Sequence, residues 1–286
     1  MRLTKDNCVY SFSKDHKPAC RVTAPAQITL ETRDCYGDQL RGGTGCTTIE
    51  WDHVNPTTGP VFVEGAQPGD ILKVTIDAID VADFGVACNE DEIRLLPVKD
   101  GYADFLGKFQ IPLNKMIGVI GVAPPAEEGA VNNATPGRHG ANMDEKLIGE
   151  GAVLYLPVFA EGALFAVGDV HAIMGDGEVG GTGLEIPADV TVTLEVIKNW
   201  QPAWPLVETD EVFAMIVSKE TMDEAIDEAV LQMHSFLKTW MADVELSDEE
   251  LYILMSLVGQ VGVSQIVDPL KTAKFVFPKK YIGIEE

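Results

Sequence analysis

Basic residues are scarce in this sequence. Its 286 residues contain 21 Lys and Arg against 45 Asp and Glu, which gives a formal net charge of -24 and a sequence pI near 4.4. A surface this acidic repels nucleic acid and anionic membranes. We therefore expect neither as a partner, which leaves neutral or cationic small molecules open as ligands.

Long apolar runs and paired cysteines are also missing. No run of 18 apolar residues occurs, and the opening residues, MRLTKDNCVYSFS, lack the apolar core of an export signal. The cysteines are odd in number and form no C-x-x-C pair; they are Cys8, Cys20, Cys35, Cys46 and Cys88. These features indicate reduced thiols rather than a disulfide framework. We expect a soluble, cytoplasmic protein.

Several common catalytic motifs are absent. The sequence has no G-x-S-x-G elbow, no P-loop, no G-x-G-x-x-G fingerprint and no H-E-x-x-H pair. The usual serine hydrolases, nucleotide-binding enzymes and zinc proteases are therefore disfavoured.

What the sequence does contain, up to about residue 205, is a series of short β-branched segments separated by Gly, Pro, Asn and Asp. Apolar residues alternate with polar ones at Leu72, Val74 and Ile76 and again along 190–196. This period of two predicts strands with one buried face. The fold class is predicted as α+β, predominantly β, with sandwich-like or barrel-like sheets in the N-terminal two-thirds.

The region 206–286 has a different pattern. A strand is expected over 211–219, followed by two capping boxes, Thr221-x-x-Glu224 and Ser247-x-x-Glu250. The first opens an apolar stripe at helical spacing, in which Met233 and Trp240 are expected to be core residues. Gly259 would end the second helix, and a last strand near 273–281 would return beside the first.

These patterns predict two parts of the chain. Residues 1–205 form a β-rich domain that carries the site, and residues 206–286 form a C-terminal β-α-α-β appendage. Within the first part, residues 97–150 show little periodicity and many Pro, Gly and Asn. A loop this long is often functional, with disorder as the alternative.

The stretch GDVHAIMGDGEVGGTGLE, residues 168–185, contains one of only five histidines. Asp169 and His171 are two residues apart, so on a strand both side chains would lie on the same face. One nitrogen and one oxygen ligand would suit zinc or another divalent ion. The alternative is a hydrogen-bonded structural histidine.

Other residues could complete such a site. Glu178 and Glu185 could return toward Asp169 and His171 after the chain reverses, while Asp176-Gly177 has the composition of a type I′ hairpin turn. A carboxylate beside a metal-activated water is the arrangement that general-base hydrolysis needs. Further polar candidates in loops or at strand ends are Asp34, Asp52, His53, His139, Asn142 and Asp144.

Cys35 is the one thiol that we consider as a nucleophile, because Asp34 and Tyr36 flank it. A small buried residue at a strand end is the alternative interpretation.

Three segments together resemble the acetamidase/formamidase family. They are GRHGANMD at 137–144, LYLPVFAEGALFAVGD at 154–169 and the stretch 168–185, where the family has an "LPV…GAL…GD-x-HA…GDGE…G…E" pattern. ETRDC at 31–35 and VNPTTGPVFVEGAQPGDILKV at 54–74 also match, so the similarity covers most of residues 25–200. Ala141 stands where the family motif has glycine.

The resemblance implies a cytosolic hydrolase that releases ammonia from small linear amides, with a β-rich fold, a homodimer or higher homo-oligomer and a divalent metal. Zinc is favoured as the metal and calcium is the alternative. We assign three roles within this site. Glu178 is expected to be the general base, and Asn142 is expected to stabilise the oxyanion. The expected metal ligands are Asp34, His53, Asp169 and His171. The other expected site residues are Asp144, Asp176 and Glu185.

Two other functions stay open at this stage. A thiol amidase would use Cys35 and would not need a metal. A non-catalytic β-protein would use the carboxylates to hold calcium for stability, since calcium prefers hard oxygen ligands.

Overall fold

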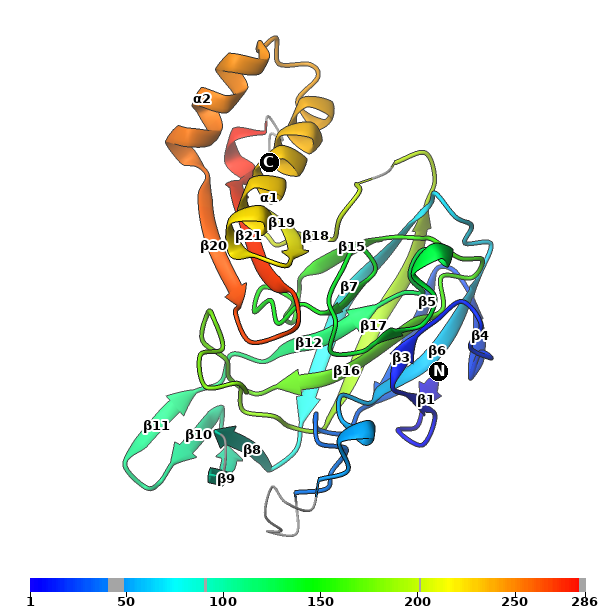
Figure 1. Cartoon of the computed structure of the whole chain (residues 1–286), viewed down its shortest axis with the longest axis vertical. Coiled ribbons are helices and arrows are strands. Elements are labelled where there is room, and N and C mark those ends of the chain that lie inside the picture. The colour runs from blue at the N-terminus through cyan, green and yellow to red at the C-terminus, as the bar shows by residue number, and fades with distance from the viewer. Residues whose placement is uncertain (41–48, 90–91, 201, 283–286) are drawn as a thin grey trace.

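The computed structural model describes residues 1–40, 49–89, 92–200 and 202–282, so Cys46 lies outside the described residues. Its body consists of β-sheets, and two helices lie at one end (Figure 1). This arrangement confirms the predicted α+β, predominantly β class.

The largest sheet among the described residues has nine strands and continues from the N-terminus into the C-terminal region. Its strands in spatial order are β1 (Arg2–Leu3), β5 (Ala26–Glu31), β17 (Ala188–Ile197), β7 (Ile71–Val81), β15 (Val153–Pro157), β18 (Leu206–Glu208), β19 (Val212–Lys219), β21 (Lys271–Pro278) and β20 (Gln260–Gln265). The predicted boundary at residue 205 falls between β17 and β18, and both of these strands belong to this sheet.

A six-stranded sheet carries much of the candidate site. Its described strands are β14 (Gly140–Asn142), β12 (Met116–Gly121), β16 (Phe165–His171), β6 (Thr57–Glu64) and β2 (Cys8–Val9), with β4 (Cys20–Thr23) pairing in parallel with β6. Every residue of β12 and of β16 is buried. These two neighbouring strands therefore form a rigid floor for the residues at their ends.

Two smaller sheets complete the described strands. A four-stranded sheet extends away from the body at the lower left of Figure 1; it contains β11 (Phe109–Pro112), β10 (Tyr102–Phe105), β9 (Glu92–Lys99) and β8 (Phe84–Asn89). The last pair is β13 (Val131–Asn132) with β3 (Ser11–Phe12).

The main core lies between the nine-stranded and six-stranded sheets. Val74 and Ile76 of β7 and Val190 of β17 share one hydrophobic cluster with Ile117 of β12 and Val167 of β16, and all five are fully buried. The period of two in the sequence therefore indicated the buried face of these strands correctly.

Strand β19 does not alternate because both of its faces are covered. Ala214 and Ile216 belong to the main core, whereas Phe213, Met215 and Val217 belong to a second cluster with the helices. A strand buried on both faces is a continuous apolar run, which is what the VFAMIV segment contains.

The two helices begin where the capping boxes predict. Helix α1 (Met222–Trp240) is capped by Thr221 with Glu224, and α2 (Asp248–Val258) by Ser247 with Glu250. A Cβ at Gly259, where α2 ends, would overlap the Phe275 ring, so glycine is needed there for space.

Two expectations for this region need correction. Met233 is fully buried, but Trp240, at the end of α1, is 42% exposed and packs through one side against other aromatic rings. The last strand does return beside β19, yet the sequence analysis missed β20, which pairs with β21.

Residues 97–150 are not a disordered loop. They contain β10, β11, β12, β13 and β14, and β12 is a central strand. Gly118 and Gly121 interrupt the apolar pattern of β12 because neighbouring atoms occupy the space that a Cβ would need. No helix in the described part of the chain combines the length and the apolarity needed to cross a membrane.

The N-terminal cap of α1 provides a test of local stability. Thr221 Oγ1 accepts a hydrogen bond from the Glu224 N–H at 3.3 Å, and the Glu224 carboxylate accepts one from the Thr221 N–H at 3.2 Å. Thr221→Ala is expected to lower the free energy of unfolding by about 1 kcal/mol, measured by urea denaturation. Thr239→Ala, on the exposed end of the same helix, is the control, and an equal loss in both variants would contradict the role of the cap.

Candidate active site

An acidic cavity of about 300 Å³ lies where distant segments of the chain meet. Its walls come from residues after β5, from the segment before β6, from β8, β14 and β16, from the glycine-rich loop before β17 and from the turn between β20 and β21. The lining residues are Cys35, Tyr36, Trp51, Val54, Asn55, Cys88, Asn142, Asp144, Asp169, Glu178, Gly180, Gly181, Thr182, Glu185 and Asp268. Among these described residues there are five carboxylates and no Lys or Arg.

His171 lies at the centre of the carboxylates. Its Nε2 is 3.2 Å from Glu185 Oε2, 3.5 Å from Asp169 Oδ1 and 3.8 Å from Asp144 Oδ1. Both Asp169 and His171 belong to β16, and the short distance between them confirms that their side chains share a face. Burial opposes the charged imidazolium, but Glu185 and Asp169 outweigh it and hold the pKa of His171 well above its usual value.

The carboxylates crowd one another. Burial, followed by the charges of Glu178 and Asp268, raises the pKa of Asp144 well above its ordinary range. Burial is also the main reason that the pKa of Glu185 rises to about 8 and that of Asp268 to about 8. A group of buried carboxylates with a single histidine is an environment that attracts a cation.

The polar atoms of this group are poorly satisfied within the described residues. Both carboxylate oxygens of Asp144, Oδ1 of Asp169, Oε2 of Glu185 and both ring nitrogens of His171 have no hydrogen-bond partner there. Buried polar atoms normally have partners. The donor set therefore fits a metal ion, which would satisfy several of these atoms together.

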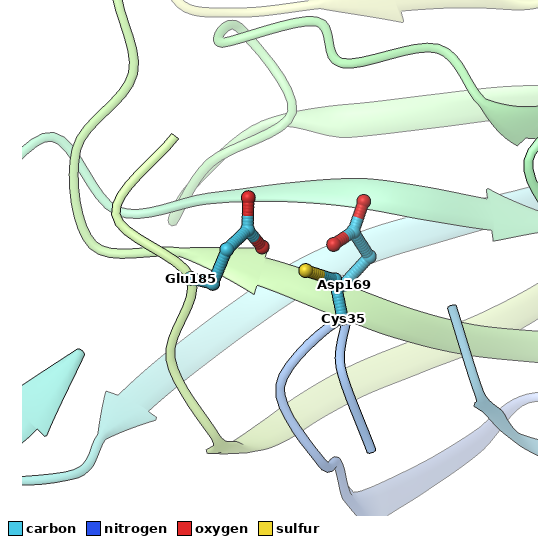
Figure 2. Close-up of side chains that lie close together, drawn as sticks. All are labelled: Cys35, Asp169 and Glu185. Carbon is cyan, nitrogen blue, oxygen red and sulfur yellow. The ribbon is translucent and has the colours of Figure 1, made fainter. Parts of the chain in front are cut away.

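Among the residues that the structure describes, two groups of three side chains could hold a metal ion. In the first, ligand atoms of Asp144, His171 and Glu178 all lie within 4.8 Å of one another; in the second, shown in Figure 2, the same holds for Cys35, Asp169 and Glu185. Nitrogen and sulfur ligands favour zinc over calcium, which prefers oxygen alone. The chemistry of the donors is thus closer to that of a zinc site.

Three of the cavity carboxylates have left-handed backbone conformations. The φ angles are 44° for Asp144, 53° for Asp169 and 48° for Glu178. This conformation costs a non-glycine residue about 1–2 kcal/mol. Unfavourable backbone conformations persist where the surrounding structure enforces them, commonly at functional sites. Here they occur together at the residues whose side chains line the cavity.

Gly118 of β12 provides the space for two of these carboxylates. A Cβ built on Gly118 would overlap Asp144 Oδ1 and would lie 2.5 Å from Asp169 Oδ2. Its φ is not in the left-handed region, so the glycine is required for space and not for conformation. The sequence analysis did not identify this residue.

The structure does not bring every expected residue into the cavity. His53, expected as a metal ligand, has a side chain that is 54% exposed and an Nδ1 that is 2.8 Å from Glu50 Oε2. The structure corrects this expectation: His53 is an exposed side chain whose Nδ1 is within hydrogen-bond distance of Glu50, because the Asp/Asn/Pro loop around it faces solvent. Asp34 is buried beside Cys35, but its Oδ1 accepts the N–H of Asp38 at 2.7 Å, and it is in neither metal-binding group.

Asp176 is also outside the cavity. Its two oxygens are paired with Lys274 at 3.0 Å and with Lys146 at 2.9 Å. The predicted type I′ hairpin is wrong, because the turn from Gly175 to Glu178 has its positive φ at Gly177, not at Asp176, and lies in a loop rather than between paired strands. That position of the positive φ is typical of a type II turn.

His139 lies near the site but does not line the cavity. It is buried in a T-shaped contact with the Phe12 ring, and neither of its ring nitrogens has a hydrogen-bond partner in the described part of the chain. Burial lowers its pKa to about 4, so it is neutral at pH 7.

The sequence analysis missed Asp268, which comes from the region 206–286. It lies on the turn between β20 and β21, lines the cavity and accepts a hydrogen bond from Asn142 Nδ2 at 2.9 Å. The Asp-Pro pair at this position is an ordinary turn signal, and only the tertiary structure brings it to the other carboxylates. The cavity is therefore built from both predicted parts of the chain.

A family model described as "Acetamidase/Formamidase family" matches residues 4–108 and 117–280. A Methylophilus methylotrophus protein named formamidase is 30% identical in an alignment that covers 73% of this chain and 70% of that protein. A Schizosaccharomyces pombe protein, whose name gives formamidase as its candidate activity, is 38% identical in an alignment that covers 60% of this chain and 60% of that protein. This chain thus spans less than two-thirds of that relative.

Solved structures share the whole fold. A Bacillus halodurans acetamidase superposes with a TM-score of 0.94 at 38% identity and covers 99% of this chain and 100% of its own. A Thermoanaerobacter tengcongensis protein, described as a predicted acetamidase/formamidase, has a TM-score of 0.93 at 43% identity and covers 100% of this chain and 98% of its own.

Gly118→Ala tests whether the close approach of β12 to the carboxylates matters. The added methyl group should displace the side chains of Asp144 and Asp169, because their oxygens occupy its position. If the cavity binds a divalent cation, we expect at least about a tenfold loss of affinity for it by titration calorimetry, with the fold retained by circular dichroism. Gly175→Ala, whose Cβ would meet nothing within 4 Å and whose φ is not left-handed, controls for loss of a glycine; unchanged cation binding in Gly118→Ala would contradict this role.

Proposed function

The chain belongs to the acetamidase/formamidase family, and on this basis we propose that it hydrolyses small linear amides to a carboxylate and ammonia. The observation that carries the proposal is the convergence of Asp144, Asp169, His171, Glu178 and Glu185 on one cavity, four of them as lining residues. Formamide and acetamide are the substrates that we would test first, because they are small and uncharged and so are compatible with a strongly acidic cavity.

We propose that a divalent cation is held by Asp144 and His171, with Asp169 beside them, and that zinc is the ion. The support is the set of buried, unpartnered oxygen and nitrogen atoms described above. A cation bound there would act as a Lewis acid that polarises the amide carbonyl and lowers the pKa of water.

The protein side chains would carry out the proton transfers and hold the substrate. Glu178 would accept a proton from the attacking water while the oxygen of that water bonds to the carbonyl carbon of the amide. It would then give the proton to the amide nitrogen as the C–N bond breaks. Asn142 Nδ2 donates one hydrogen to Asp268, so its second N–H remains for the oxygen of the substrate. Glu185 would keep His171 oriented through their 3.2 Å contact.

A thiol-dependent route is the second candidate, because Cys35 lines the cavity and lies close to the carboxylates of Asp169 and Glu185 (Figure 2). Burial, together with the nearby charges of Glu185, Asp169 and Asp34, raises the pKa of this thiol. The thiolate is the reactive form, so this environment disfavours attack by Cys35. We therefore rank the water route first.

A homodimer or higher oligomer and a cytoplasmic location stay predictions. The four described cysteines are free thiols, which is compatible with a reducing compartment. Light scattering of the purified protein would check the assembly.

Ammonia release tests the function directly. Purified protein should hydrolyse formamide or acetamide, lose this activity after chelation and regain it with zinc, with metal content measured on the same samples. Cys35→Ser should keep most of the turnover. A chelator-resistant activity that Cys35→Ser abolishes would favour the thiol route, and fully metal-loaded protein without turnover would favour a stabilising metal.

Two substitutions separate the base from the metal ligands. His171→Ala should lose zinc and turnover together, because it removes the central nitrogen ligand. Glu178→Gln should retain zinc but lower kcat by about 10²–10⁴-fold, since it removes the proton acceptor. His53→Ala is the matched control and should change neither. If Glu178→Gln lost zinc as His171→Ala does, Glu178 would be a ligand and not the base.

A further inference from the structure

A buried ammonium group lies outside the lining of the acidic cavity. Lys274, on β21, is 6% exposed, and its Nζ is 3.0 Å from Glu145 Oε1 and 3.0 Å from Asp176 Oδ1. Lys274 and Glu145 do not line the cavity, and neither belongs to a metal-binding group. A buried lysine is costly unless it is paired, so this group needs an explanation.

The partners of Lys274 are themselves held in place. Glu145 is fully buried, and its Oε2 accepts a hydrogen bond from Ser264 Oγ at 2.5 Å. The second oxygen of Asp176 pairs with Lys146 at 2.9 Å. Although burial lowers the pKa of Lys274, the carboxylates of Glu145 and Asp176 outweigh it and raise the pKa above its usual value, so the ammonium stays charged.

This cluster connects three segments that each carry a cavity carboxylate. Asp144 directly precedes Glu145, Glu178 follows Asp176 by two residues, and Asp268 lies on the turn that begins after Ser264. The segments are distant in the sequence, yet Lys274 and its partners contact all three.

Backbone hydrogen bonds join two of these segments directly. The N–H of Gly177 donates to the carbonyl of Ser264 at 2.8 Å, and the N–H of Ile266 donates to the carbonyl of Gly177 at 3.1 Å. The side chain of Gln265 then closes the turn, since its Oε1 accepts the N–H groups of Val267 and Asp268 at 2.8 Å and 3.0 Å. The position of Asp268 is thereby fixed.

The reason for such a cluster is the repulsion inside the cavity. The charges of Glu178 and Asp268 raise the pKa of Asp144, and the charge of Glu178 also raises that of Asp268, so these carboxylates oppose close approach when they are ionised. The Lys274 ammonium attracts two of the segments through Glu145 and Asp176, and the hydrogen bond from Ser264 to Glu145 joins the third segment to them. The ammonium does so without occupying the cavity, so the space for substrate is preserved.

We propose that Lys274, together with Glu145 and Asp176, positions the three loops that present Asp144, Glu178 and Asp268. Lys274 is a positioning residue and makes no contact with substrate. The predicted effect of Lys274 on turnover rests on the proposed amide hydrolysis, whereas its predicted effect on the order of the three loops does not.

The experiment compares Lys274→Met with Lys279→Met. Lys279 is the matched control because its Nζ pairs with Glu208 at 2.6 Å, near the end of the same strand but away from the cavity lining. In Lys274→Met, hydrogen exchange measured by mass spectrometry should become at least about tenfold faster in 144–147, 176–178 and 264–270 together. For formamide, kcat should fall at least about tenfold while KM changes less than about threefold. Lys279→Met should show neither change.

A second variant keeps the test decisive if Lys274→Met does not fold. Asp176→Asn removes the charge of the partly exposed partner of Lys274. It should speed hydrogen exchange in 176–178 and 264–270 and lower kcat with little change in KM. Lys274→Arg keeps the positive charge, so it should retain much of the exchange protection and of the kcat that Lys274→Met loses. Unchanged exchange in the three segments, or loosening without any loss of kcat in an active enzyme, would overturn the proposal. If the wild type hydrolyses no amide, the proposed function fails and the exchange data alone decide the positioning role.

Discussion

The crowding of buried carboxylates around His171 is the constraint on which the rest of this structure depends. Asp144, Asp169 and Glu185 all lie within 3.8 Å of one imidazole nitrogen, and Glu178 is close enough to share a metal ion with His171. Like charges in a low-dielectric interior repel strongly, so this arrangement attracts a cation and depends on a rigid scaffold.

The fold meets that constraint with several local adaptations. β12 and β16 are fully buried neighbours, and Gly118 leaves room for two carboxylates where any side chain would displace them. Left-handed conformations at three of the acidic residues accompany their placement in the cavity wall. Lys274 holds the outer ends of the same loops from a position outside the cavity lining. These adaptations together allow the C-terminal hairpin to complete a site whose other walls come from the N-terminal sheets.

Much of the fold could be predicted from local patterns. Alternation at Leu72, Val74 and Ile76 identified a buried face, and the capping boxes at Thr221 and Ser247 marked the helix starts, because both signals depend on residues close in sequence. β12 and β20 were missed. β12 contains glycines that its neighbours require, and β20 is a short edge strand whose first two residues are exposed. These two strands were thus missed because their residues reflect tertiary contacts or a place at the sheet edge.

For the site, the sequence by itself determined the central pair and indicated the family. Asp169 and His171 share a face because strand periodicity is local, and the glycine-rich stretch to Glu185, with its family resemblance, indicated an amidase with a divalent metal. Only the tertiary structure decided which other residues join them. It brought in Asp268 and Gly118 and left out His53, because the approach of a distant turn, the space beside a strand and the exposure of a loop are set by packing among segments far apart in the chain.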